Sequence, residues 1–569
     1  AIVVQPTSTT YVSATTSALS TLDTVSGSNY SLTTGYINIE AAGTLEGRDA
    51  EITLTGISDI IFTKSGGGTF NYGTSNVTFS QTSGNTTLTS MELDFYDLTI
   101  NMSGRTGTLG ADTNIFGNLA VSAGTLSNDV YVVTTSGDFS GSGNFLQGNA
   151  TFTVGGDWTN TGTFTASSGA TSGVILSGTS KQITGPSGGI SFYNLSVTGT
   201  YTNNNSGTIT INSAFTGAGT WTQGTDSTLR INSTSAITGL DASSNTNTVI
   251  YGGGGNQTVK GVNYSTLNLS SSGVKTMTGV TSASGSFNIL DTATMTDNDS
   301  ITVGRKFTYN SSGSTTLTSS RDIKVGSFEL VQGTLVDNGN TIQVTGSGTT
   351  VWTLTGGTFT PTGTAYFTGE TPGIGSSNFN NLTIATSGTA SLDGSITTEG
   401  NVEVSSGTLF ADTYGIYVKG DWIMEGTFLP GTSKVTFNGI YNQLIRGNTN
   451  FYDLAITRST PSGVITFYGG GTTGVTGSLV LQGAPGALLT LKSHNTSDWN
   501  LDVDGATVEV TYVAVSHSNA SGGDTIDATD KSNVDQYNNT NWLFYPTTST
   551  DLFIFNFDGQ LDMEGLNIE

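Results

Sequence analysis

The stretch Phe95-Tyr96-Asp97-Leu98-Thr99-Ile100 decides the fold of this chain, because three further copies follow it. They read Phe192-Tyr193-Asn194-Leu195-Ser196-Val197, Phe379-Asn380-Asn381-Leu382-Thr383-Ile384 and Phe451-Tyr452-Asp453-Leu454-Ala455-Ile456. Internal similarity of this kind predicts a repeat protein, in which each unit buries its apolar face against the next one. We expect the repeat core to contain the first and fourth residue of each copy. These are Phe95, Leu98, Phe192, Leu195, Phe379, Leu382, Phe451 and Leu454.

The spacing of the copies indicates the length of one unit. Phe95 and Phe192 lie 97 residues apart, and Phe379 and Phe451 lie 72 apart. Both values are close to multiples of about 24, which predicts a solenoid with coils of that length. A second motif, Gly-Asp-aromatic, occurs at Gly137-Asp138-Phe139, Gly156-Asp157-Trp158 and Gly420-Asp421-Trp422. We expect its aspartates at turns, where the side chain bonds to nearby backbone.

The chain therefore reads as all-β, an elongated parallel β-helix (β-solenoid) with non-repeat terminal strands. Its strands are short, rich in β-branched and aromatic residues, and separated by Gly, Asn, Asp or Ser turns. Right-handed winding is predicted, because the strict hexapeptide period typical of left-handed β-helices is absent. A series of short antiparallel domains remains the alternative, although Asn-Gly and Asp-Gly hairpin signals are few.

The composition and net charge of the chain argue against some classes of function. The chain of 569 residues has 17 Lys and Arg against 42 Asp and Glu, a net charge of −25, and no cysteine. No basic cluster suggests a nucleic-acid partner, and no apolar run is long enough for membrane insertion. Because the chain begins at Ala1 with a strand-like pattern, we expect a processed, exported protein, located outside the cell or on its surface. A boundary within a longer protein, or a trimmed virion protein, is the alternative.

Four regions follow from these patterns. Residues 1–50 are predicted to form an N-terminal strand, cap and assembly segment, 51–490 the repeat array, 491–545 acidic C-terminal coils or a cap, and 546–569 a linker and hydrophobic strand. Exposed apolar strands at the two ends would aggregate unless something covers them. We expect them to dock onto another copy of the chain, with an intramolecular cap as the alternative. The predicted assembly residues are Ile2, Val3, Val4, Leu552, Phe553, Ile554, Phe555 and Phe557.

The sequence shows no pattern of catalytic residues, and we predict that the chain is not an enzyme. His494 and His517 lie in no nucleophile motif. The acidic residues between Asp498 and Asp535 raise calcium as an alternative, but no known calcium-loop pattern is present and we expect no cofactor. The tryptophans could form a sugar-binding stripe, although stacking in the core is the favoured interpretation. They are Trp158, Trp221, Trp352 and Trp422.

In the four hexapeptides and in the region from Trp499 through Val515-Ser516-His517-Ser518-Asn519-Ala520 to Asn538-Asn539-Thr540-Asn541-Trp542, the chain resembles bacterial Gly/Thr/Asn-rich β-solenoid surface and fibre proteins, including adhesin-like repeats. The resemblance covers roughly residues 60 to 545 and is specific for architecture. Together with the apolar strands at the two ends, it leads us to expect a structural subunit that self-assembles head-to-tail into an extracellular filament, with copies of itself as partners. A cell-surface adhesin that binds glycans or a viral receptor-binding fibre is the alternative, and a polysaccharide depolymerase comes third.

Overall fold

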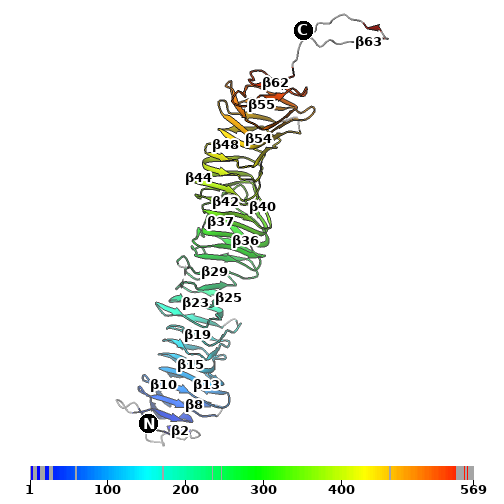
Figure 1. Cartoon of the computed structure of the whole chain (residues 1–569). Coiled ribbons are helices and arrows are strands. Elements are labelled where there is room, and N and C mark those ends of the chain that lie inside the picture. Colours follow the sequence, from blue (N-terminus) through cyan, green and yellow to red (C-terminus); the bar gives the residue numbers. More distant parts are fainter. Residues whose placement is uncertain are drawn as a thin grey trace. The chain divides into compact units, whose positions relative to one another are not determined.

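The structure is a computed structural model that describes residues 2–3, 9–12, 20–24, 30–57, 60–169, 172–233, 235–244, 246–318, 320–459, 463–545, 556–557 and 560–561. It is a parallel β-solenoid of about 25 turns with 58% strand and no helix in the part that is described (Figure 1). Accordingly, none of these residues forms a helix long and apolar enough to cross a membrane.

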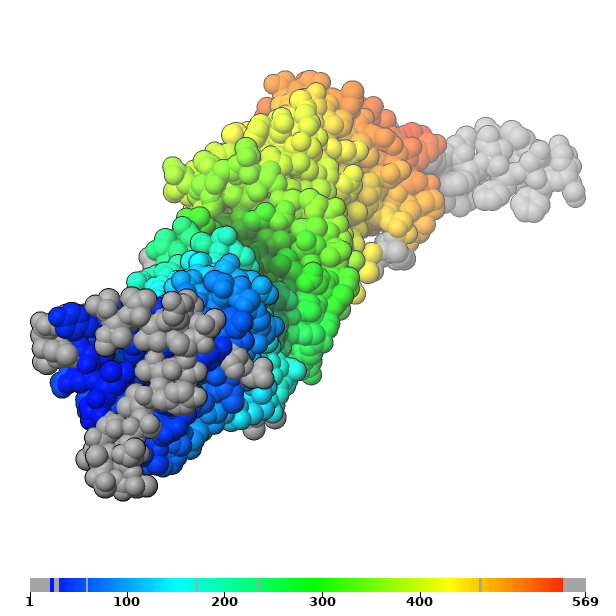
Figure 2. All heavy atoms as spheres, turned by 90° about the horizontal axis from the view of Figure 1, so that it is seen from below, coloured from blue at the N-terminus to red at the C-terminus, as the bar shows by residue number. Residues whose placement is uncertain are grey.

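The chain divides into two compact units. Unit 1 contains residues 1–321 and 331–334, and unit 2 contains residues 322–330 and 335–569. Within each unit, successive coils follow the order of the sequence, as the colour gradient in Figure 2 shows. Each unit is therefore built from contacts between neighbouring stretches of chain.

Unit 1 begins with three rows of parallel strands. The rows are β1 (Ile2–Val3), β4 (Leu32–Thr34), β7 (Glu51–Leu54), β10 (Asn76–Phe79) and β13 (Asp97–Thr108); β2 (Thr9–Val12), β5 (Tyr36–Ile39), β8 (Ile60–Lys64) and β11 (Thr86–Thr89); and β3 (Ser20–Asp23), β6 (Gly43–Glu46) and β9 (Thr69–Asn71). A later row contains β12 (Leu93–Phe95), β14 (Thr113–Ile115), β16 (Val133–Thr135), β19 (Thr151–Val154), β21 (Gly173–Leu176), β23 (Ile190–Val197), β25 (Thr208–Thr216), β27 (Thr228–Ile231), β29 (Thr248–Tyr251) and β31 (Thr266–Leu269). Each coil contributes one strand to each row, so the sheets grow along the unit.

Unit 2 repeats this plan. One row contains β38 (Thr341–Val344), β41 (Thr364–Phe367), β44 (Asn381–Leu392), β46 (Val402–Phe410), β48 (Trp422–Met424), β51 (Gln443–Arg446), β53 (Val464–Phe467), β55 (Leu489–Ser493), β58 (Val513–Val515) and β61 (Val534–Asp535). Another contains β43 (Ser377–Phe379), β45 (Ile396–Thr398), β47 (Ile416–Val418), β50 (Lys434–Phe437), β52 (Thr449–Thr457), β54 (Thr472–Gln482), β56 (Trp499–Val503) and β59 (Ser518–Asn519). The strands β60 (Ile526–Ala528) and β62 (Trp542–Phe544) pair with each other and form a separate sheet of two strands.

The alternative of short antiparallel domains is wrong. Long-range strand pairs are parallel throughout the described rows, for example β10 with β13 and β50 with β52. Antiparallel pairing occurs in the described residues only locally, between β63 (Asn556–Phe557) and β64 (Gln560–Leu561) and in a bridge from Ala484 to Ala487. Parallel neighbours arise because each coil returns in the same direction. The handedness of the winding stays a prediction.

The core lies inside the coils, where alternate strand residues are buried. The eight residues named for the repeat core are at most 1% exposed. Trp158, Trp221, Trp352 and Trp422 are also at most 1% exposed, so they belong to the core and form no sugar-binding stripe. Phe328 and Trp352 stack with ring centroids 4.2 Å apart, and Trp158 meets Phe139 edge-on at 4.7 Å. Such pairs stabilise the core beyond their buried area.

The coils vary in length around the predicted value of about 24 residues. Ile52 pairs with Val77 and Leu454 with Leu479, a step of 25 residues in both cases, and other coils are shorter. In unit 1, Phe95 pairs with Ile115, and Ile115 with Thr135, which is a step of 20 residues in both cases. This series of paired residues continues through Val154 and Leu176 to Val197 of β23, whereas Phe192 of the same strand pairs with Ile211. The hexapeptide copies at Phe95 and Phe192 therefore occupy different positions on the coil, and their spacing is not a whole number of coils.

The third residue of each hexapeptide explains why the motif recurs. Its side-chain oxygen accepts a hydrogen bond from the following coil, 20 to 25 positions later in the chain. The acceptor and donor pairs are Asp97 with Asn118 N–H, Asn194 with Ala214 N–H, Asn381 with Asn401 N–H, and Asp453 with Ser478 Oγ–H. The motif thus combines inward apolar residues with a polar link between coils.

The aspartates of the Gly-Asp-aromatic motif also link successive coils, through a series of hydrogen bonds that we call the ladder. The prediction that these side chains bond to nearby backbone is wrong. Asn118 Oδ1 accepts the N–H of Asp138 at 2.9 Å, Asp138 Oδ1 accepts the N–H of Asp157 at 2.7 Å, and Asp157 Oδ1 accepts the N–H of Gln182 at 2.9 Å. In unit 2, Asp421 Oδ1 likewise accepts the N–H of Leu444. The stacked coils bring a backbone donor of the next turn closer than any local one.

The glycine before each of these aspartates has no side chain, which leaves room for the backbone and the aspartate or asparagine side chain of the preceding coil. A Cβ at Gly156 would lie 2.3 Å from Asp138 Oδ1 and from the carbonyl carbon of Gly137. We expect Gly156→Ala to lower the stability of the surrounding coils by about 1–3 kcal/mol, as overpacking does. Gly188→Ala is the matched control, because a Cβ there meets no atom within 4 Å. Hydrogen exchange of the amides in β19 and β21 measures both variants, and equal effects would contradict the explanation.

Candidate functional site at the coil ends

The predicted assembly residues lie at the two ends of the chain. Ile2 and Val3 form β1, which pairs in parallel with Leu32 and Thr33 of β4. Val4, Leu552, Phe553, Ile554 and Phe555 lie outside the described residues. Phe557 belongs to β63 and pairs with Gln560. The first predicted segment is thus the edge strand of the first coil, in the same row as the strands that follow.

The C-terminal coil ends in a core layer that is only partly covered. Ile526 and Ala528 in β60 are fully buried, and they pair with Trp542 and Phe544 in β62. Trp542 and Phe544 point to the same side of their strand but remain partly exposed. Their rings stack with centroids 5.8 Å apart. Core positions of inner coils are nearly always covered by the next layer. Among the residues that the structure describes, no further coil covers Trp542 and Phe544.

The N-terminal coil shows the same feature. Leu22 in β3 pairs with Leu45 of β6, which in turn pairs with Phe70 of β9. Leu45 is fully buried, whereas Leu22 is partly exposed. Among the described strands, β3 has β6 as its neighbour on one side and none on the other. As far as the described residues go, both ends therefore present a partly exposed apolar layer together with a strand edge that has no further strand beside it.

The acidic C-terminal region does not gather its carboxylates. In the part of the chain that the structure describes, no group of three or more His, Cys, Asp or Glu residues could hold a metal ion. Asp527 and Asp530 instead accept hydrogen bonds from Thr529 and Ser532, and these bonds lower the pKa of both aspartates. The calcium alternative thus has no matching arrangement in the described residues.

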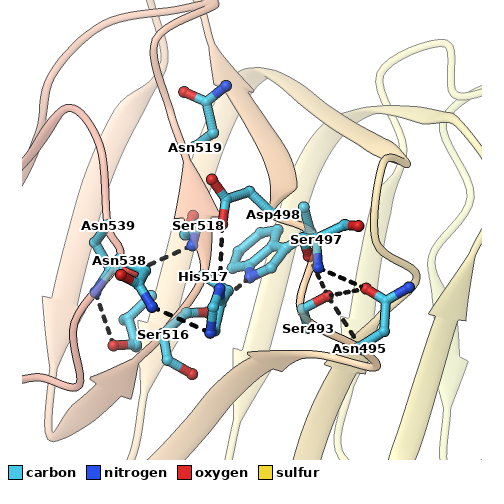
Figure 3. Close-up of polar contacts among 12 residues, drawn as sticks. Ser493, Asn495, Ser497, Asp498, Ser516, His517, Ser518, Asn519, Asn538 and Asn539 are labelled. Atoms are coloured by element: carbon cyan, nitrogen blue, oxygen red, sulfur yellow. Dashed lines mark hydrogen bonds and ion pairs between the residues drawn. The ribbon is translucent and has the colours of Figure 1, made fainter.

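His517 is the one histidine that contacts a carboxylate, within the described part of the chain (Figure 3). Its Nδ1 lies 3.2 Å from Asp498 Oδ1, and its Nε2 lies 3.2 Å from the side-chain nitrogen of Asn538. When Asn538 donates to Nε2, Nδ1 carries the hydrogen and donates to Asp498. The position that a nucleophilic hydroxyl would take is thereby filled by an amide, so this pair lacks the geometry of a catalytic triad.

A buried lysine in unit 1 was not anticipated from the sequence. Lys275 is fully buried, and its Nζ lies 2.7 to 2.9 Å from four oxygens. The oxygens belong to the carbonyls of Gly253, Gly255 and Ser272 and to the side chain of Gln257. Burial lowers the pKa of Lys275 to about 8, so the ammonium is still charged at neutral pH. The Gly-rich run 252–255 was the available signal, since it brings bare carbonyls close together.

Comparison of the chain with known protein families, with curated proteins and with solved structures found no match.

Proposed function

We propose that the chain is a structural subunit of an extracellular filament, in which the C-terminal layer of one copy stacks on the N-terminal layer of the next. The observation that carries the proposal is the pair of partly exposed core layers in the described residues, with Trp542 and Phe544 at one end and Leu22 at the other. Burying apolar surface of this kind is the main driving force of association.

The geometry of the strand edges supports the same proposal. The described pairing of both end coils is parallel, so a second copy added at either end would continue the rows in the same direction. The two ends are different surfaces, and a contact between unlike surfaces of identical subunits produces an open filament rather than a closed dimer. Docking by Leu552 to Phe555 stays a prediction.

Three variants test the proposal. We expect the unchanged protein to form filaments in electron micrographs, and both the double variant W542D/F544D and the single variant L22D to remain monomeric and rich in β-structure by circular dichroism. A carboxylate at either layer would have to be buried without a partner, which is costly. L429D is the control, because Leu429 is 48% exposed on the outside of β49 (Thr427–Leu429) and should leave the filaments intact.

Mixing the two blocked variants separates end stacking from a general loss of solubility. L22D keeps a functional C-terminal layer and W542D/F544D keeps a functional N-terminal layer, so an equimolar mixture should form dimers that cannot grow. Analytical ultracentrifugation measures this. Filaments in either blocked variant, or an absence of filaments in the unchanged protein, would contradict the proposal.

A cell-surface adhesin that binds glycans is the second candidate. Tyr468 is 45% exposed and stacks on His494 with ring centroids 4.1 Å apart, and the Arg446 guanidinium carbon lies 5.8 Å from the Tyr468 ring. Arg446 and His494 come from the coils before and after Tyr468, so the exposed part of this stack offers an aromatic edge beside a cation, which suits a contact with a sugar. Binding of the monomeric L22D variant to a panel of immobilised glycans would favour this function.

A further inference from the structure

A cavity in unit 2 lies at one corner of three successive coils. It has a volume of about 330 Å³ and is lined by residues 438–440, 457–459 and 482–484. These triplets follow β50, β52 and β54, whose ends are in register, with Phe437 opposite Ile456 and Thr457 opposite Gln482. The cavity therefore has a rigid sheet on one side and three stacked turns on the other.

Arg458 lines this cavity and lacks most of its expected partners. The residue is 5% exposed, and its Nη2 donates to Gln443 Oε1. Its Nε and Nη1 are buried and have no hydrogen-bond partner. In the part of the chain that the structure describes, no carboxylate forms an ion pair with it, whereas the exposed Arg446 pairs with Glu425 at 2.9 Å. Burial lowers the pKa of Arg458 only to about 10, so its charge persists at neutral pH.

Such an arrangement is costly unless something compensates it. A buried, unpaired charge destabilises a fold by several kcal/mol, and guanidinium groups are the preferred protein partners of carboxylates, sulfates and phosphates. Gly463 packs close to the guanidinium, because a Cβ at that position would lie 3.0 Å from Nε. Arg458 itself lines the cavity, so its unpartnered donors belong to a side chain that borders open space.

We propose that the cavity at Arg458 binds an oxyanion, namely the carboxylate or sulfate group of a small acidic ligand. The Arg458 guanidinium supplies the positive charge, and its side chain must turn slightly for the buried Nε–H and Nη1–H groups to donate to the oxygens of the ligand. Ser459 and Asn438 at the cavity wall supply further polar groups. Ile440, which is 57% exposed, borders the same cavity and provides an apolar surface for the rest of the ligand. Binding at this corner is independent of filament growth at the coil ends.

Calorimetric titration at constant ionic strength tests the proposal with sodium sulfate and with sodium glucuronate, and glucose serves as the uncharged comparison. We expect at least one anion to bind with a dissociation constant of about 1 mM or tighter, and glucose not to bind. R458Q should weaken the binding by about tenfold or more, since charge-assisted bonds are lost. R446Q is the control, because Arg446 is exposed and already paired, and it should bind as the unchanged protein does. Preference for sulfate indicates an inorganic anion, and preference for glucuronate indicates an acidic sugar.

A measurement on the unchanged protein guards against a folding defect in R458Q. The anion that binds should slow hydrogen exchange at the amides of residues 438–440 and 457–459 and leave the coils of unit 1 unaffected. The proposal is overturned if neither anion binds, if R458Q binds as tightly as the unchanged protein, or if the exchange of these amides does not respond.

Discussion

Replacing Trp158 with alanine is expected to lower the local free energy of unfolding of its coils by about 3–5 kcal/mol. Trp158 is 1% exposed and lies within 6 Å of Phe139, Phe152, Phe164 and Phe192, measured between ring centroids. These rings come from several successive coils. The substitution therefore leaves a cavity at a point where the stacking of several coils depends on one side chain.

Hydrogen exchange should be used for this measurement, because a repeat array need not unfold in one step. We expect faster exchange in β17 (Phe139–Ser140) and β23, with little change in coils far along the chain. Phe116→Ala is the control, since Phe116 is 48% exposed and stacks only on the surface against Tyr72. A loss in Trp158→Ala no larger than in Phe116→Ala would show that the aromatic cluster does not hold the coils together.

Lys275→Met is expected to lower the free energy of unfolding by about 1–3 kcal/mol, because it leaves buried neutral oxygens without their donor. Methionine fills much of the same volume but cannot donate, so the carbonyls of Gly253, Gly255 and Ser272 and the Gln257 side chain lose a donor. A buried acceptor without a hydrogen-bond partner lowers stability by the full free energy of its desolvation.

The effect is measured by chemical denaturation in which the hydrogen exchange of the amides in β29 and in β32 (Val274–Met277) is monitored. Lys434→Met is the matched control, because Lys434 is exposed at the start of β50. If both variants are equally stable, water or the surrounding backbone must satisfy the four oxygens, and the ammonium is not a structural link.

Much of the fold could be predicted from residue types alone. The hexapeptides and the Gly-Asp-aromatic motifs predicted stacked coils, because apolar residues that recur beside glycine turns must bury one face against a neighbour. The coil length could not be obtained from them. Phe95 and Phe192 stand at different positions on their coils, so the distance between them contains a fraction of a turn.

The candidate sites were less accessible to sequence reasoning. Ile2 and Val3 could be recognised as an apolar strand, but their role as the edge of the first coil depends on pairing with β4. The partly exposed C-terminal layer can be recognised only when the structure shows that β62 belongs to the last described coil. Arg458 looks like any surface arginine in the sequence, and only its 5% exposure and the missing partners of its Nε and Nη1 atoms make it notable.

The sequence by itself determined that this protein is a β-solenoid, since local alternation and glycine turns leave few other ways to bury its apolar residues. The tertiary structure decided which residues meet across coils. Partners such as Asp138 and Asp157, or Lys275 and Gly253, are set by the length of the coil between them, which differs from one coil to the next. Burial, unpaired charge and partly exposed ends are properties of this pairing between coils, which is why the proposed sites emerge only in the folded chain.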